Sequence, residues 1–137
     1  MNKAQTSLEI SVLLGAMLII LIIFIAINLD MTGLFVTTNS RNRISIALDD
    51  IVNTAETVFL QGSGARSRVL ISLPANIYNA SIENSTITFE IFSRFGGTVV
   101  PIYRIIDFNI TGELPVTSGN HWVFIESFGR HVNVSLS

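Results

Sequence analysis

The chain contains no cysteine in its 137 residues, which excludes disulfides and thiolate metal sites and leaves the redox compartment open. Charged residues are also scarce, at 13% of the chain, against about 25% in an average soluble protein. The net charge is −2, and the eight basic residues are scattered rather than clustered. This composition does not indicate a nucleic-acid-binding surface.

Residues that usually carry catalysis are few. His121 and His131 are the only histidines and fall in adjacent predicted strands, where they could form a metal pair, but no carboxylate stands beside them at ligand spacing. Asp49 and Asp50 could serve as acid and base, although an amphipathic helix usually turns such a pair to water. The Gly62-Ser63-Gly64 sequence follows a predicted helix, whereas a phosphate-binding loop opens one. We therefore expect no enzymatic activity, no metal and no cofactor.

The strongest feature is an apolar run from Leu8 to Leu29. A hydrocarbon core about 30 Å thick needs roughly 20 helical residues, so this run is long enough to span a membrane. A signal peptide usually has an apolar core of about 7–15 residues before a small-residue cleavage site. Here Val12 to Ile27 holds sixteen residues without a polar side chain, and a poor Ala-x-Ala site follows. We therefore expect the run to be retained.

The orientation of the run follows from its flanking charges. Lys3 precedes it, and no further basic residue occurs before Arg41. Because basic residues favour the cytoplasmic side of a membrane, we expect a cytoplasmic amino end and an external remainder.

A short motif opens the apolar run. Gln5 to Leu13 reads QTSLEISVL, a Gln-x-Ser-x-Glu-x-x-x-Leu pattern. It resembles the class III signal peptides of archaeal type IV pilin-like proteins. The resemblance implies that a membrane prepilin peptidase recognises Ala4, Gln5, Ser7 and Glu9, cuts between Ala4 and Gln5, and leaves the apolar helix on the mature chain. It covers about thirty residues, and the remainder is similar in layout alone.

Glu9 is unusual because a carboxylate inside hydrocarbon is costly unless it is paired, which makes it a functional candidate by itself. The resemblance implies that Glu9, together with Gln5, serves assembly by pairing with the freed amine of a neighbouring subunit. The alternative is that Glu9 lies at the headgroup level, solvated and favoured by the amino end of the helix.

Helix propensity falls after Leu29, where DMTGLFVTTNS contains a glycine and several β-branched residues. We expect a kink, a melted turn or a helix break between Asp30 and Asn39, with Asn39 or Ser40 as a cap. An amphipathic helix then follows and ends at Gln61 to Gly64. Its apolar stripe comprises Ile44, Ala47, Leu48, Ile51, Val52, Ala55, Val58 and Phe59.

The last seventy residues or so predict a sheet, because segments rich in Val, Ile, Phe and Thr alternate with turn residues. Short connections favour hairpins in an antiparallel meander or small sandwich. Pro101 would disturb a central ladder, so its strand should be at an edge or bulged. The predicted strands are Arg68 to Leu73, Ile77 to Ile82, Thr86 to Phe92, Thr98 to Ile106, His121 to Phe128 and His131 to Leu136.

These elements predict an α+β fold in which a long amino-terminal helix packs on a small antiparallel β-sheet or sandwich. We expect a leader at residues 1–4, an apolar transmembrane and assembly helix at 5–29, a kink and amphipathic helix at 30–64, and an extracellular antiparallel β-domain at 65–137. Four Asn-x-Ser/Thr sequons lie in the last part, at Asn79, Asn84, Asn109 and Asn133. Each is a candidate for N-glycosylation.

The resemblance implies a structural pilin subunit that polymerises with copies of itself into an adhesive surface filament. Its other partners would be the prepilin peptidase and a membrane assembly platform, and the precursor would reside in the cell membrane. Two alternatives remain. One is a permanently membrane-anchored β-domain protein of the archaellum-associated type, which binds envelope or surface-layer components. The other is a minor pseudopilin of the same family.

Overall fold

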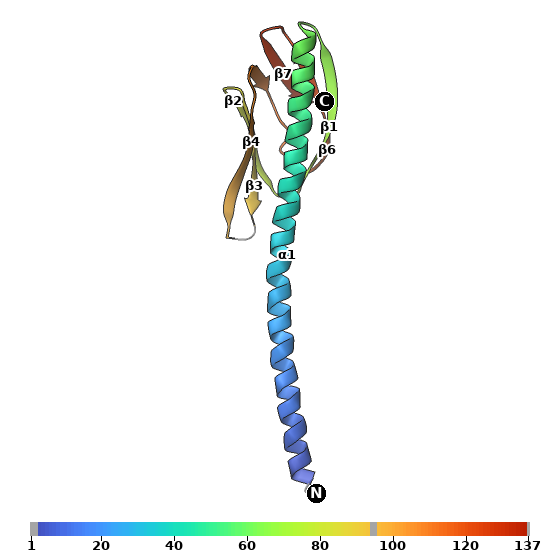
Figure 1. Ribbon diagram of the computed structural model, residues 1–137, viewed down its shortest axis with the longest axis vertical. Coiled ribbons are helices and arrows are strands. Elements are labelled where there is room, and N and C mark those ends of the chain that lie inside the picture. The colour runs from blue at the N-terminus through green and yellow to red at the C-terminus, as the bar shows by residue number, and fades with distance from the viewer. Residues whose placement is uncertain (1–2, 94–95, 137) are drawn as a thin grey trace. The chain divides into compact units, whose positions relative to one another are not determined.

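The protein has an α+β fold with an amino-terminal helix, as the sequence predicted (Figure 1). The computed structural model describes the backbone of residues 3–93 and 96–136, and the side chains of 7–29, 36–93 and 96–136. The chain divides into two compact units, residues 1–36 and 37–137, which are described separately below. The elements are α1 (Lys3–Gln61), β1 (Arg66–Leu73), β2 (Ile77–Glu83), β3 (Thr86–Ser93), β4 (Thr98–Ile105), β5 (Asn109–Gly112), β6 (Gly119–Ser127) and β7 (His131–Leu136).

The backbone of α1 is helical from Lys3 to Gln61, including every residue from Asp30 to Asn39. The predicted helix break in this segment is therefore wrong, and neither Asn39 nor Ser40 caps a new helix. β-Branched residues cost only a few tenths of a kcal/mol each, and a glycine about 1 kcal/mol. Ending one helix and starting another would instead leave several backbone groups without helical partners at each new end.

In the second unit, one face of α1 is buried. Ile44, Leu48, Ile51 and Ala55 are fully buried, at the three- and four-residue spacing that defines one side of a helix. The helix ends where predicted. Gly62 has a φ of +92°, and its N–H donates to the carbonyl of Phe59 at 3.1 Å, which closes the last turn.

The strands form two sheets, with orders β2-β3-β4 and β1-β6-β7-β5. The first sheet is the predicted antiparallel meander. In the second, β1 pairs with the distant β6, and β5 pairs with β7 in parallel. The strands predicted from the sequence do not include β5. A strand of four residues carries little periodic signal, and its partner is about twenty residues further along the chain.

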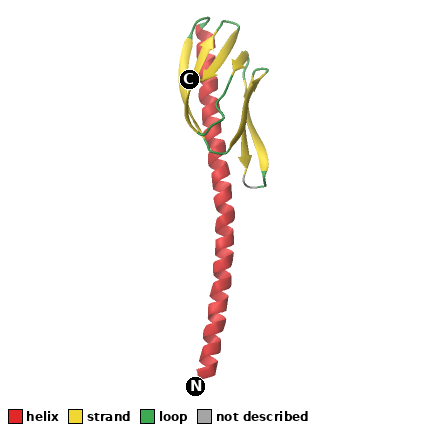
Figure 2. Ribbon diagram, turned by 180° about the vertical axis from the view of Figure 1, so that it is seen from behind, coloured by secondary structure: helices red, strands yellow, loops and turns green. Residues whose placement is uncertain are grey.

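The core lies between these sheets and α1. Figure 2 shows one sheet on each side of the carboxyl-terminal half of the helix, and buried side chains of both sheets and of α1 form a single cluster. β3 illustrates the sequence pattern, because Ile87, Phe89 and Ile91 alternate with less buried residues. β4, which contains Pro101, is an edge strand as predicted.

Candidate functional site in the amino-terminal helix

The first unit is dominated by an apolar segment of α1 that the rest of the described structure leaves uncovered. Ser7–Leu29 has a mean hydropathy of 3.2, and none of it is buried. Large apolar side chains point out on every face, from Ile25 at 49% exposure to Leu29 at 71%. A helix that is apolar all round needs lipid or protein around it. The segment is long and apolar enough to cross a membrane. A signal sequence near the amino terminus can have the same length and composition.

Glu9 is the only ionisable residue between Ser7 and Leu29. Its side chain is exposed and lies near the amino end of α1. Ser7 is also exposed, and its carbonyl accepts a hydrogen bond from the Ser11 hydroxyl at 2.9 Å. Ala4 and Gln5 belong to α1, but their side chains lie outside those that the structure describes. The leader at residues 1–4 is likewise largely outside the described residues.

The four sequons lie on the β-domain in different settings. Asn79 in β2 and Asn109 at the start of β5 are exposed. Asn84 is exposed in the turn between β2 and β3, with a φ of +46°. Asn133 in β7 is half-buried, and its side-chain carbonyl accepts a hydrogen bond of 3.4 Å from the Thr111 hydroxyl. The geometry therefore leaves more room for a glycan at the first three.

The remaining candidate residues are not brought together. His121 lies in β6 opposite Ile71 of β1, and His131 begins β7 and stacks on Phe128 with ring centroids 5.1 Å apart. The β6–β7 register places the two histidines near opposite ends of β6. Within the described residues, no group of three potential metal ligands occurs.

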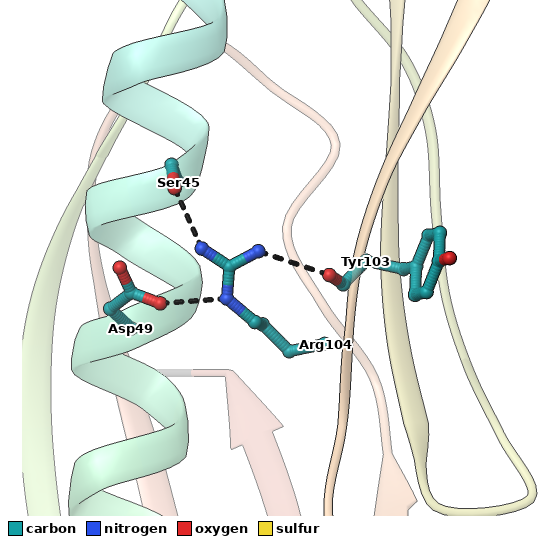
Figure 3. A network of polar contacts seen from close by, with 4 residues as sticks. All are labelled: Ser45, Asp49, Tyr103 and Arg104. Carbon is teal, nitrogen blue, oxygen red and sulfur yellow. Dashed lines mark hydrogen bonds and ion pairs between the residues drawn. The ribbon is translucent and has the colours of Figure 1, made fainter.

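Asp49 has a structural partner that the sequence did not indicate. Its Oδ1 accepts a hydrogen bond from Nε of Arg104 at 2.8 Å, while Nη2 of Arg104 donates to the Ser45 hydroxyl at 2.8 Å (Figure 3). Nη1 donates to the Tyr103 carbonyl at 3.1 Å. The guanidinium group thus joins β4 to α1. This geometry does not support the hypothesis that Asp49 and Asp50 act as a catalytic acid and base.

The Arg104 guanidinium group also forms part of a groove between α1 and β4, with a cavity volume of about 620 Å³. We call this the basic groove; it is lined by Thr38, Arg41, Asn42 and Ser45 of α1 and by Pro101 to Arg104 of β4. The sequence does not predict this groove, because its two walls lie about sixty residues apart in the chain. No local motif marks either wall.

No family model, no curated protein and no solved structure matches the chain.

Proposed function

We propose that the chain is the structural subunit, a pilin, of an archaeal type IV pilus-like surface filament. A prepilin peptidase would cut between Ala4 and Gln5, and the mature chain would assemble through its apolar helix. The observation that carries the proposal is the coincidence of two features in one helix. The Gln-x-Ser-x-Glu motif opens it, and the following Ser7–Leu29 segment is exposed and apolar on every face.

The energetics of this segment explain why assembly would follow processing. Sixteen large apolar side chains between Leu8 and Leu29 are exposed in the single chain. Burial of each contributes about 1.5–3 kcal/mol, which sums to tens of kcal/mol. A subunit leaving the membrane must keep these side chains away from water, and a bundle of identical helices provides such a surface. Adhesion would then be a property of the polymer.

Glu9 would contribute a charge pair to the same assembly step. After cleavage, the amine of Gln5 is the nearest new cation, four residues before Glu9. Four helical residues correspond to about 6 Å along the axis. If the carboxylate of one subunit pairs with the amine of its neighbour, both charges are neutralised in an apolar bundle and the axial offset between the two subunits is fixed.

The β-domain would face the outside of the cell in the precursor and the surface of the filament after assembly. Its exposed sequons Asn79, Asn84 and Asn109 are consistent with this location, because N-glycans are attached outside the cytoplasm. The apolar helix supports membrane association of the precursor.

Mass spectrometry of the mature chain tests the proposal. The full chain is produced in a host with and without a prepilin peptidase, and the sheared surface fraction is separated from the membranes. We expect sheared filaments whose first residue is Gln5, and an uncut membrane-bound chain without the peptidase. Retention of residues 1–4 in filaments, with removal of Met1 allowed, would contradict the processing step. A chain that stays in the membrane after shearing would instead support the permanently anchored β-domain protein.

A further inference from the structure

The outer face of the four-stranded sheet carries large apolar side chains that are open to solvent. Leu70 of β1 and Trp122 of β6 are opposite each other in the register and are 46% and 43% exposed. Phe124, two residues after Trp122, is 41% exposed. Val123 and Ile125 alternate with them and are fully buried, so these three side chains face away from the core. We call Leu70, Trp122 and Phe124 the exposed stripe. Contiguous exposed apolar surface usually marks a contact site.

Arg68 of β1 holds the indole ring at the centre of the exposed stripe. Its guanidinium carbon lies over the Trp122 ring, 4.6 Å from the ring centroid. Arg68 has no carboxylate partner in the part of the chain that the structure describes, so this cation–π contact fixes its side chain. A ring that is already held in place loses little conformational freedom when another group covers it. The exposed stripe is therefore preorganised for contact with a further apolar surface.

The sequon at Asn133 lies on the same face of the sheet. In the β6–β7 register Asn133 is opposite Glu126, and Ser135 is opposite Phe124. Asn133 is therefore a diagonal neighbour of Phe124, at a separation of about 7–8 Å. Trp122 lies two residues further along β6, which adds about 7 Å. An oligosaccharide of a few sugars attached to Asn133 is long enough to reach both rings.

The setting of Asn133 differs from that of the other three sequons. Its Oδ1 accepts a hydrogen bond from the Thr111 hydroxyl at 3.4 Å, while its Nδ2, the atom to which a glycan is attached, makes no hydrogen bond within the described residues. The side chain is half-buried, so the first sugar would start against the sheet surface. Asn79 and Asn84 belong to the other sheet and its turn, and Asn109 in β5 is one strand further from the exposed stripe.

We propose that Asn133 carries an N-glycan and that its sugars lie over Phe124 and Trp122, covering the exposed stripe of the same chain. One face of a sugar ring consists of C–H groups, which pack against an aromatic ring, while the hydroxyls at the rim stay in water. The glycan would shield apolar surface that otherwise promotes non-specific association. The inference rests on the external location of the β-domain in the proposed function, and it does not depend on filament assembly.

Fluorescence quenching tests the cover directly, because Trp122 is the only tryptophan of the chain. The full chain and its variants are purified from the native host as single chains in detergent, and mass spectrometry determines the modification of Asn133. Ser135→Ala removes the sequon but keeps Asn133. We expect the glycan mass to disappear and the acrylamide quenching constant to rise about twofold, because roughly half of the exposed ring would be uncovered. Ser135→Thr keeps the sequon and should retain both the glycan and the low quenching constant.

Ser81→Ala is the second control, because it removes the Asn79 sequon on the three-stranded sheet and should leave the quenching of Trp122 unchanged. An unmodified Asn133 in the unaltered chain, or equal quenching of Ser135→Ala and Ser135→Thr, would overturn the inference. Protection of Trp122 that appears only in filaments would assign the cover to a second copy and would overturn it too. Filaments assembled from chains with an unmodified Asn133 would leave the proposed function intact. Glycosylated chains that remain uncut in the membrane would instead contradict the proposed function alone.

Discussion

Nε of Arg104 in β4 lies 2.8 Å from Oδ1 of Asp49 in α1, and this ion pair connects the three-stranded sheet to the helix. The two side chains are 37% and 51% exposed, so solvent screens much of their attraction. The hydrogen bond from the same guanidinium group to Ser45 is more shielded from water. The pair therefore serves mainly to fix the position of β4 against α1.

Replacement of Arg104 by alanine tests this link. We expect Arg104→Ala to lower the free energy of unfolding by about 1 kcal/mol, since it removes one exposed ion pair and one partly buried hydrogen bond. The measurement is urea unfolding of the full chain in detergent, followed by the fluorescence of Trp122. Arg130→Ala is the control, because Arg130 is exposed and has no ion pair among the described residues. Equal effects of the two variants would show that the link contributes nothing.

The two faces of α1 should respond differently to the same substitution. Ile51 is fully buried, whereas Ile46 is 62% exposed on the same helix. We expect Ile51→Ala to cost about 2–5 kcal/mol, because it leaves a cavity in the core. Ile46→Ala should change stability by no more than about 0.5 kcal/mol. Thermal unfolding followed by circular dichroism compares the two, and similar losses would contradict the assignment of the buried face.

The parallel pairing of β5 with β7 depends on Gly112. This residue has a φ of +128°, and a Cβ there would overlap the carbonyl group of Val134. Gly119 has a similar φ of +118° but open space around its Cα. Gly119→Ala should therefore cost the backbone strain alone, about 1–3 kcal/mol. Gly112→Ala should cost clearly more, because β7 must also move. Urea midpoints of the two variants provide the comparison, and a smaller loss for Gly112→Ala would argue against the parallel pair.

Glu9 should matter more for assembly than for cleavage. Glu9→Gln keeps the size of the side chain and removes its charge, so we expect the peptidase to cut it while the filament yield falls at least about tenfold. Ser11→Ala is the control, because the Ser11 hydroxyl bonds to the carbonyl of Ser7 in its own helix. Immunoblots of membrane and sheared fractions report both steps. An unchanged filament yield would refute the assembly role of Glu9.

Local sequence patterns predict local structure in this chain, whereas contacts between distant segments have no local pattern. The buried stripe around Ile44 and Ile51 and the end of α1 at Gln61 were predicted correctly, because helical periodicity and a glycine are local features. Pairing of β1 with β6 was not predictable in the same way, since it is set by packing across the core. The missed Asp49–Arg104 pair has the same origin, because its members are fifty-five residues apart.

The order of the strands also constrains when the second unit, residues 37–137, can fold. The β2-β3-β4 sheet uses only neighbouring segments, so it can form as soon as those residues are available. β1, in contrast, pairs Arg66 with Glu126, sixty residues later, and β5 has no partner until β7 arrives. As the chain is synthesised from its amino end, the four-stranded sheet and the core beneath it therefore form last. Until then the apolar face of α1 around Ile51 is not covered by the four-stranded sheet. We expect the chain to be most prone to aggregation during this interval.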